Sequence, residues 1–145
     1  VYSVPILLNK QKVDKTIIEK LKIKAKQPNL NDWKRVVKAK LMPEKEVNVS
    51  FVGKYTELKD SYKSINEALE HAGIKNKAKV NINFVEAENI SSKNIKKTLK
   101  NADAVLVPGG FGEDGSIGKE NAIKVARKMK IPFLGSIPVE DYYKQ

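Results

Sequence analysis

Short apolar runs alternate with amphipathic segments through the last two thirds of this sequence. The runs typical of strands are Val47–Val52, Lys79–Val85, Ala104–Val107 and Ile131–Leu134, and segments with the apolar spacing of helices lie between them, at 61–72, 92–99 and 117–130. The resulting order βαβαβαβ predicts an α/β fold with a doubly wound, mostly parallel sheet, because parallel neighbours need a crossover connection. Ligands of such sheets bind at the carboxyl ends of the strands.

The first 44 residues have a different pattern. Val1–Leu8 is apolar and has the composition of a strand, and two amphipathic helices are expected at Val13–Leu21 and Leu30–Leu41, the second with Asn31 and Asp32 as caps. Pro43 is expected to end the second helix. We therefore predict a helical linker over 1–44 and an α/β domain over 45–145.

The composition argues against several classes of protein. No apolar run approaches the roughly 20 residues that cross a bilayer, and no signal-peptide pattern is present. With no cysteine there is no disulfide framework. The expected location is the cytoplasm, without a membrane partner.

The net charge of +11 raises the possibility of nucleic-acid binding. Only two of the cations are arginines, Arg35 and Arg127, so most of the charge comes from lysine, which lacks the planar fork that reads guanine. The lysines are scattered and few aromatic residues stand between them. We expect a solvated lysine surface and no nucleic-acid partner.

One glycine-rich segment has the composition of a binding turn. Pro108-Gly109-Gly110-Phe111-Gly112 follows the apolar run 104–107 and precedes a helical segment. Three glycines in four positions let backbone N–H groups approach a ligand or a developing oxyanion. The alternative is a tight turn that binds nothing.

Two nucleotide-binding motifs fail on their spacing. Five residues separate Gly112 from Gly118-Lys119, where a Walker loop has four, and Glu120 replaces the residue that would hold Mg²⁺. The first expected strand is followed by Gly53-Lys54-Tyr55, without the further glycines of a dinucleotide fingerprint.

Three motifs together resemble the CTP synthase family. They are the segment from Val52 to Leu69, the turn Leu106–Gly112 and the stretch Ile131–Gly135, and the likeness extends upstream through the two lysine-rich helices. The resemblance implies a flavodoxin-like sheet of the class I glutaminase type, incomplete in this chain, after the end of a synthase domain and an interdomain linker.

The resemblance also implies a function. Enzymes of this family hydrolyse glutamine and pass ammonia to a synthase domain, which uses ATP to convert UTP into CTP. Gly109, Gly110 and Phe111 would then bind L-glutamine and its oxyanion, and Gly53, Lys54 and Tyr55 would form a loop facing the synthase domain. ATP, Mg²⁺ and UTP would belong to that other domain, with no cofactor or metal in this chain, and the full enzyme would be a homo-oligomer.

The departures from the family pattern concern catalysis. Ile137 stands where the nucleophilic cysteine is expected, Ser136 lies one place early, and the only histidine is His71, expected near the end of a helix that Gly73 terminates. Asp114 replaces an expected arginine. We therefore assign no catalytic residue to this chain.

Two hypotheses follow. The first is that the chain is a part of CTP synthase and is inactive by itself. Its incomplete sheet would have an open edge, so we expect this part to fold poorly or to self-associate in isolation. If the natural chain is longer and has further residues near 136–138, it could retain its cysteine. The second is a catalytically dead glutaminase-like module that binds a partner protein. Whether the chain is an enzyme therefore stays open at this point.

Overall fold

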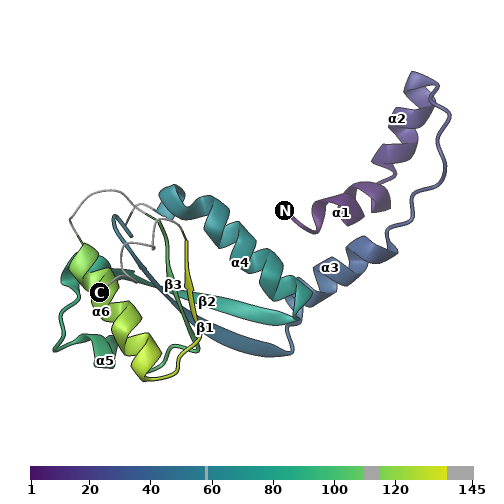
Figure 1. Cartoon of the computed structure of the whole chain (residues 1–145). Coiled ribbons are helices and arrows are strands. Elements are labelled where there is room, and N and C mark those ends of the chain that lie inside the picture. The colour runs from purple at the N-terminus through teal and green to yellow at the C-terminus, as the bar shows by residue number, and fades with distance from the viewer. Residues whose placement is uncertain (58, 110–114, 137–145) are drawn as a thin grey trace. The chain divides into compact units, whose positions relative to one another are not determined.

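The computed structural model describes residues 1–57, 59–109 and 115–136, and from residue 13 onward they form helices and strands in the expected order (Figure 1). The helices are α1 Val4–Lys10, α2 Val13–Leu21, α3 Asn31–Leu41, α4 Lys63–Lys75, α5 Ile95–Thr98 and α6 Ser116–Lys128, with short 3-10 helices η1 Lys59–Tyr62 and η2 Ala87–Asn89. The strands are β1 Lys45–Gly53, β2 Ala78–Glu86, β3 Ala104–Val107 and β4 Phe133–Gly135. None of the described helices is long and apolar enough to cross a membrane.

The chain divides into two compact units. The first contains residues Val1–Lys45 and Ala72–Lys79, and the second contains Glu46–His71 and Val80–Gln145. These compact units do not test the predicted domain boundary near Pro43, which therefore stays a prediction.

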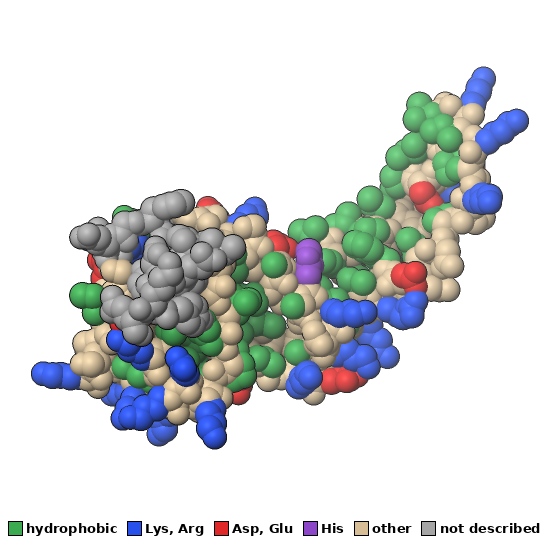
Figure 2. All heavy atoms as spheres, viewed as in Figure 1, with side chains coloured by type: hydrophobic (Ala, Val, Ile, Leu, Met, Phe, Trp, Pro, Cys, Tyr) green, Lys and Arg blue, Asp and Glu red, His purple; other side chains and the backbone are tan. Residues whose placement is uncertain are grey.

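The first unit is built mainly from α1, α2 and α3. Trp33 donates a hydrogen bond from its indole N–H to the carbonyl of Tyr2 (2.6 Å), and the ammonium group of Lys40 lies 5.3 Å from the centre of the Tyr2 ring. Val37 is the one buried residue among the described residues of these three helices. Figure 2 shows hydrophobic side chains gathered along α1 and α2, and Val4, Leu7, Leu8, Ile17 and Leu21 are all exposed.

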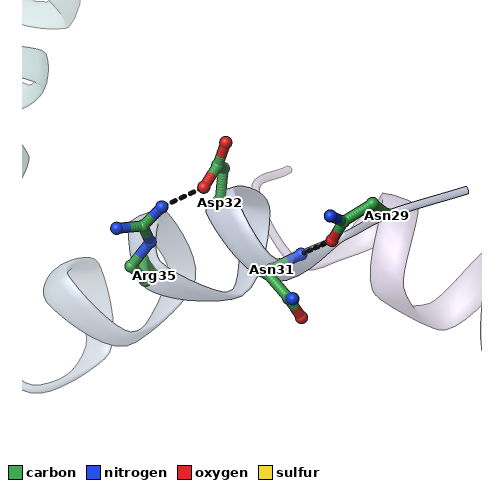
Figure 3. Close-up of polar contacts among 4 residues, drawn as sticks. All are labelled: Asn29, Asn31, Asp32 and Arg35. Atoms are coloured by element: carbon green, nitrogen blue, oxygen red, sulfur yellow. Dashed lines mark hydrogen bonds and ion pairs between the residues drawn. The ribbon is translucent and has the colours of Figure 1, made fainter.

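Two expectations about the first unit are wrong. The strand-like segment Val1–Leu8 forms most of α1, because Pro5 lies at the start of the helix, where its missing N–H has no cost. Asn31 and Asp32 do not cap α3: the side-chain oxygen of Asn29 accepts the Asn31 N–H (3.0 Å), and Asp32 pairs with Arg35 (Figure 3).

The second unit contains the sheet, with strand order β2-β1-β3-β4. β3 is parallel to both of its neighbours, with Val49 opposite Ala104 and Val105 opposite Phe133. This is the flavodoxin-like order, so the predicted α/β fold with a doubly wound parallel sheet is confirmed.

Each face of the sheet has its own hydrophobic core. On one face Val52, Val105 and Val107 pack with residues of α5 and α6. On the other face Phe51 and Leu106 pack with residues of α4. Helices thus cover both faces (Figure 1), and successive residues of β1 and β3 alternate between the two cores, as the period of two in a strand requires.

One helix boundary differs from the prediction. Gly73 does not end α4 but lies buried inside it, and the helix continues to Lys75. Glycine often adopts the left-handed conformation that ends a helix, which is why the sequence predicted an end at Gly73. In the structure it is Lys77, at φ +52°, that has this conformation after the helix.

Candidate functional site

The two loop segments singled out by sequence lie next to each other in the structure. β1 and β3 are neighbours in the sheet, the connection from β1 leads to β2 on one side, and the connection from β3 leads to β4 on the other. Their carboxyl ends therefore flank the position where the strand order reverses, which is where sheets of this type bind ligands. The Gly53–Tyr55 loop and the start of the β3 turn, Pro108 and Gly109, both lie there.

Gly53 is buried where the two segments meet. A Cβ atom at this position would lie 2.8 Å from Cε1 of Phe51, 3.1 Å from the hydroxyl of Tyr62 and 3.3 Å from Cγ of Pro108. Real Cβ atoms essentially never lie within 3.0 Å of such a neighbour, so this close approach favours glycine, and a larger residue would force the Phe51 ring to shift.

Two side chains from other elements hold the loop after Gly53. The hydroxyl of Tyr62 donates to the carbonyl oxygen of Lys54 (2.5 Å). The backbone N–H and the hydroxyl of Thr56 both donate to Oε2 of Glu86, each at 2.9 Å. Tyr55 lies between these anchors with φ +53° and is 66% exposed, so the loop presents this aromatic side chain to its surroundings.

The same loop borders an acidic hollow. Tyr55, Glu57, Glu86 and Glu88 line a space of about 290 Å³ at the carboxyl ends of β1 and β2. Within the described ranges, no group of three or more His, Cys, Asp or Glu residues is arranged to hold a metal ion.

The β3 turn is tied to the end of β4. The backbone N–H of Gly109 donates to the hydroxyl oxygen of Ser136 (2.7 Å), and the N–H of Ser136 donates to the carbonyl of Val107 (3.1 Å). The Gly109 amide thus has a partner within the chain, and it can bind an oxyanion only after the Ser136 hydroxyl moves. Gly110, Phe111, Asp114 and Ile137 lie outside the described residues.

The sequence profile of the family described as Glutamine amidotransferase class-I matches residues 57–135, more than half of the chain. The chain belongs to the class-I glutamine amidotransferase family.

The relatives of this amidotransferase chain specify the likeness further. It is 49% identical over 136 residues to the CTP synthase of Pelagibacter ubique (strain HTCC1062) and 47% identical over 135 residues to that of Caldanaerobacter subterraneus subsp. tengcongensis. Each alignment covers 93% of this chain and 25% of the relative. The resemblance to CTP synthase is confirmed, and the chain spans about a quarter of the length of these relatives.

A solved structure agrees with this assignment. The glutaminase domain of Trypanosoma brucei CTPS, determined with bound acivicin, matches with a TM-score of 0.57 and 36% identity, over 61% of this chain and 35% of that one. The fold of this amidotransferase chain is therefore shared with a glutaminase domain of that enzyme.

The sequence singled out the segments after β1 and β3, whose role as a site stays a prediction, but not the residues that contact them. Tyr62, Thr56, Glu86 and Ser136 contribute the hydrogen bonds described above. Each is an ordinary polar residue by sequence, and its role depends on a contact across the fold. No motif in the chain could have indicated these pairs.

Proposed function

We propose that this chain forms the interdomain linker and the amino-terminal part of the glutamine amidotransferase domain of a CTP synthase, the ligase that makes CTP from UTP with ATP and ammonia from glutamine. The observation that carries the proposal is the extent of the likeness. The family profile begins at residue 57, whereas the two CTP synthases align with 93% of the chain. The similarity therefore includes residues that precede the profile match, which favours CTP synthase over other amidotransferases.

The proposed glutamine site is the turn after β3. Gly109, Gly110 and Phe111 would bind L-glutamine, and backbone N–H groups of the turn would stabilise the oxyanion of the tetrahedral intermediate. Because the Gly109 amide donates to Ser136, we expect glutamine binding to displace this hydroxyl.

Hydrolysis needs a nucleophile that this chain does not contain. The sequence has no cysteine, and Ile137 stands at the expected position. Ser136 uses its hydroxyl oxygen as the acceptor for Gly109, and among the described residues no hydrogen bond joins it to a base that could activate a serine. We propose that the chain alone is inactive, and the lack of cysteine also supports the second candidate function, a glutaminase-like module that only binds a partner.

The loop after β1 is the proposed contact with the synthase domain. Tyr55 is exposed and Lys54 and Thr56 are buried on either side of it, so the loop presents one aromatic anchor of the kind that interfaces favour. ATP, Mg²⁺ and UTP would bind to the synthase domain, and we assign none of them to residues of this chain. We propose a homo-oligomer for the full enzyme.

A matched pair of chimeras tests the proposal. In the first chimera, residues 1–135 of this chain replace the segment of the Pelagibacter ubique enzyme that aligns with them. The second chimera also carries Ser136 and Ile137 of this chain in place of the relative's residues. We expect both to make CTP from supplied ammonia and only the first to make CTP from glutamine, since only the first retains the relative's cysteine.

The two ammonia measurements separate function from folding. Ammonia-dependent synthesis without glutamine-dependent synthesis in the first chimera would contradict the amidotransferase assignment and favour the partner-binding module. Glutamine-dependent synthesis in the second chimera would contradict the proposed inactivity. Loss of both activities in both chimeras would contradict the proposed match between this segment and the synthase domain.

A further inference from the structure

Another hollow lies at the edge of the sheet opposite the candidate site. Its volume is about 400 Å³, a size typical of small-molecule pockets, and it is lined by Ile123, Arg127, Lys130, Ile131, Pro132 and Phe133. The helix α6 ends here and β4 begins here, so the hollow borders the amino end of β4 (Figure 1). The proposed glutaminase function uses none of the lining residues.

The turn after α6 builds this hollow. Lys130 has φ +56°, the left-handed conformation that commonly follows a helix. Its backbone N–H donates to the carbonyl of Arg127 (3.2 Å), and the N–H of Ile131 donates to the carbonyl of Ala126 (2.9 Å). This is the hydrogen-bond pattern of a Schellman motif, in which the chain leaves the helix sharply. Ile123 lies one helical turn before Arg127, on the same face of α6.

The lining of the hollow is mostly apolar. Ile123 is 9% exposed, and Ile131 and Phe133 are half-buried against the core on this face of the sheet. Arg127 and Lys130 are exposed. Such side chains line an apolar surface with their aliphatic stems and keep their charged ends in water. The hollow therefore combines an apolar floor with a cationic rim.

No anion engages either cation in the part of the chain that the structure describes. Hydrogen bonds and ion pairs to the side chains of Arg127 and Lys130 are absent there, whereas Lys124 on the same helix pairs with Glu120. The helix end does not need these cations as caps, because backbone N–H groups already bond its terminal carbonyls. The described lining residues include no Asp or Glu, so the potential at the rim favours an external anion.

We propose that this hollow binds a small monocarboxylic acid with an aromatic or branched aliphatic body. The body contacts Ile131 and Phe133. The guanidinium fork of Arg127 matches the two oxygens of a carboxylate, and Lys130 adds a second positive charge. A carboxylate is favoured over a phosphate because the carboxyl end of α6 contributes negative potential, which opposes a doubly charged group more strongly than a singly charged one.

The test is an NMR titration of the full chain with phenylacetate at neutral pH and constant ionic strength. Three further probes separate the contributions: 2-phenylethanol has the ring without the charge, acetate has the charge without the ring, and phenyl phosphate has a second charge. We expect phenylacetate to shift the amide signals of Ile131 and Phe133 in a saturable way. Its affinity should exceed that of each other probe by about tenfold or more.

The variant Arg127→Met removes the charge and keeps a flexible apolar stem at the rim. Its affinity for phenylacetate should fall about tenfold or more, whereas its affinity for 2-phenylethanol should stay within about twofold. Lys128→Met changes an exposed lysine of α6 that does not line the hollow, and it should leave both affinities unchanged. Lys130→Met, with the same expected loss, serves if the arginine variant does not fold, and the β3 amide signals report folding in each variant.

Several results would overturn the inference. Acetate binding as tightly as phenylacetate would indicate ions on a basic surface, and equal binding of 2-phenylethanol would indicate an apolar hollow that does not recognise charge. Tighter binding of phenyl phosphate would contradict the carboxylate assignment. Amide shifts away from the hollow, or an unchanged affinity in Arg127→Met, would place the ligand elsewhere. No measurement uses glutamine, so failure here leaves the proposed function untouched.

Discussion

Tyr62 shows how a single residue determines the form of the loop after β1. Its hydroxyl donates to Lys54, and its ring packs edge-on against Phe51 with the ring centres 4.6 Å apart. Burial raises the pKa of Tyr62 above its usual 10.0, and the negative charge of Glu86 adds to the rise. Because the folded-state pKa is raised, the contribution of Tyr62 to stability is complete below pH 10 and is lost as the pH rises through the folded-state value.

This sign gives a prediction for Tyr62→Phe. The difference in unfolding free energy between wild type and variant should be constant below pH 10 and should decline above it. Urea unfolding of both proteins at several pH values measures this difference. Subtracting one free energy from the other cancels the contributions from the other tyrosines and the lysines, which titrate in both proteins. A difference that grows above pH 10 would contradict the assignment.

At the scale of elements, the packing of α6 on η2 depends on the glycine at position 118. A Cβ at Gly118 would lie 1.8 Å from the backbone oxygen of Ala87, which is 1% exposed. Alanine has a helix propensity about 1 kcal/mol better than that of glycine, but overpacking against backbone costs about 1–3 kcal/mol or more. We expect Gly118→Ala to lower the unfolding free energy by about 2 kcal/mol, measured by urea unfolding.

The control for this prediction lies on the same helix. Lys128→Ala, at an exposed position, should change the unfolding free energy by no more than about 0.5 kcal/mol. If Gly118→Ala were as stable as the wild type or more so, helix propensity would outweigh the clash, and the close packing of α6 on η2 would be wrong.

At the scale of the whole molecule, the two units differ in how much apolar surface they bury. The second unit has fully buried residues on both faces of the sheet, including Phe51, Ile95 and Leu99, whereas α1, α2 and α3 bury Val37 alone among their described residues. Regions with few buried apolar contacts open at lower free energy. We therefore expect the first unit to unfold at a lower urea concentration than the sheet.

The single tryptophan makes this prediction measurable. Trp33 belongs to the first unit, so its fluorescence reports on that unit, and the NMR signals of the β3 amides report on the sheet. Trp33→Phe should leave the β3 transition unchanged. A common midpoint for both signals in the wild type would show instead that the chain unfolds as one cooperative whole.

Local patterns predicted the elements of this fold well. The helix at Val13–Leu21 and the strand at Ala104–Val107 have the bounds expected from periodicity, because the spacing of apolar side chains reflects the geometry of a single element. The same reasoning failed for Val1–Leu8 and for Gly73. A short apolar run suits a strand or a helix equally, and a glycine near a helix end does not by itself indicate where the helix stops.

The sequence by itself determined the order of strands and helices from residue 13 onward and the membership in an amidotransferase family, since these depend on neighbouring residues and on motifs. Only the tertiary structure decided that Glu86 holds Thr56, that Ser136 holds Gly109 and that Lys54 lies beside the start of α6. These residues are far apart in the chain and ordinary in type. They meet because parallel strands place their carboxyl ends along one edge of the sheet, and that arrangement follows from topology rather than from any local pattern.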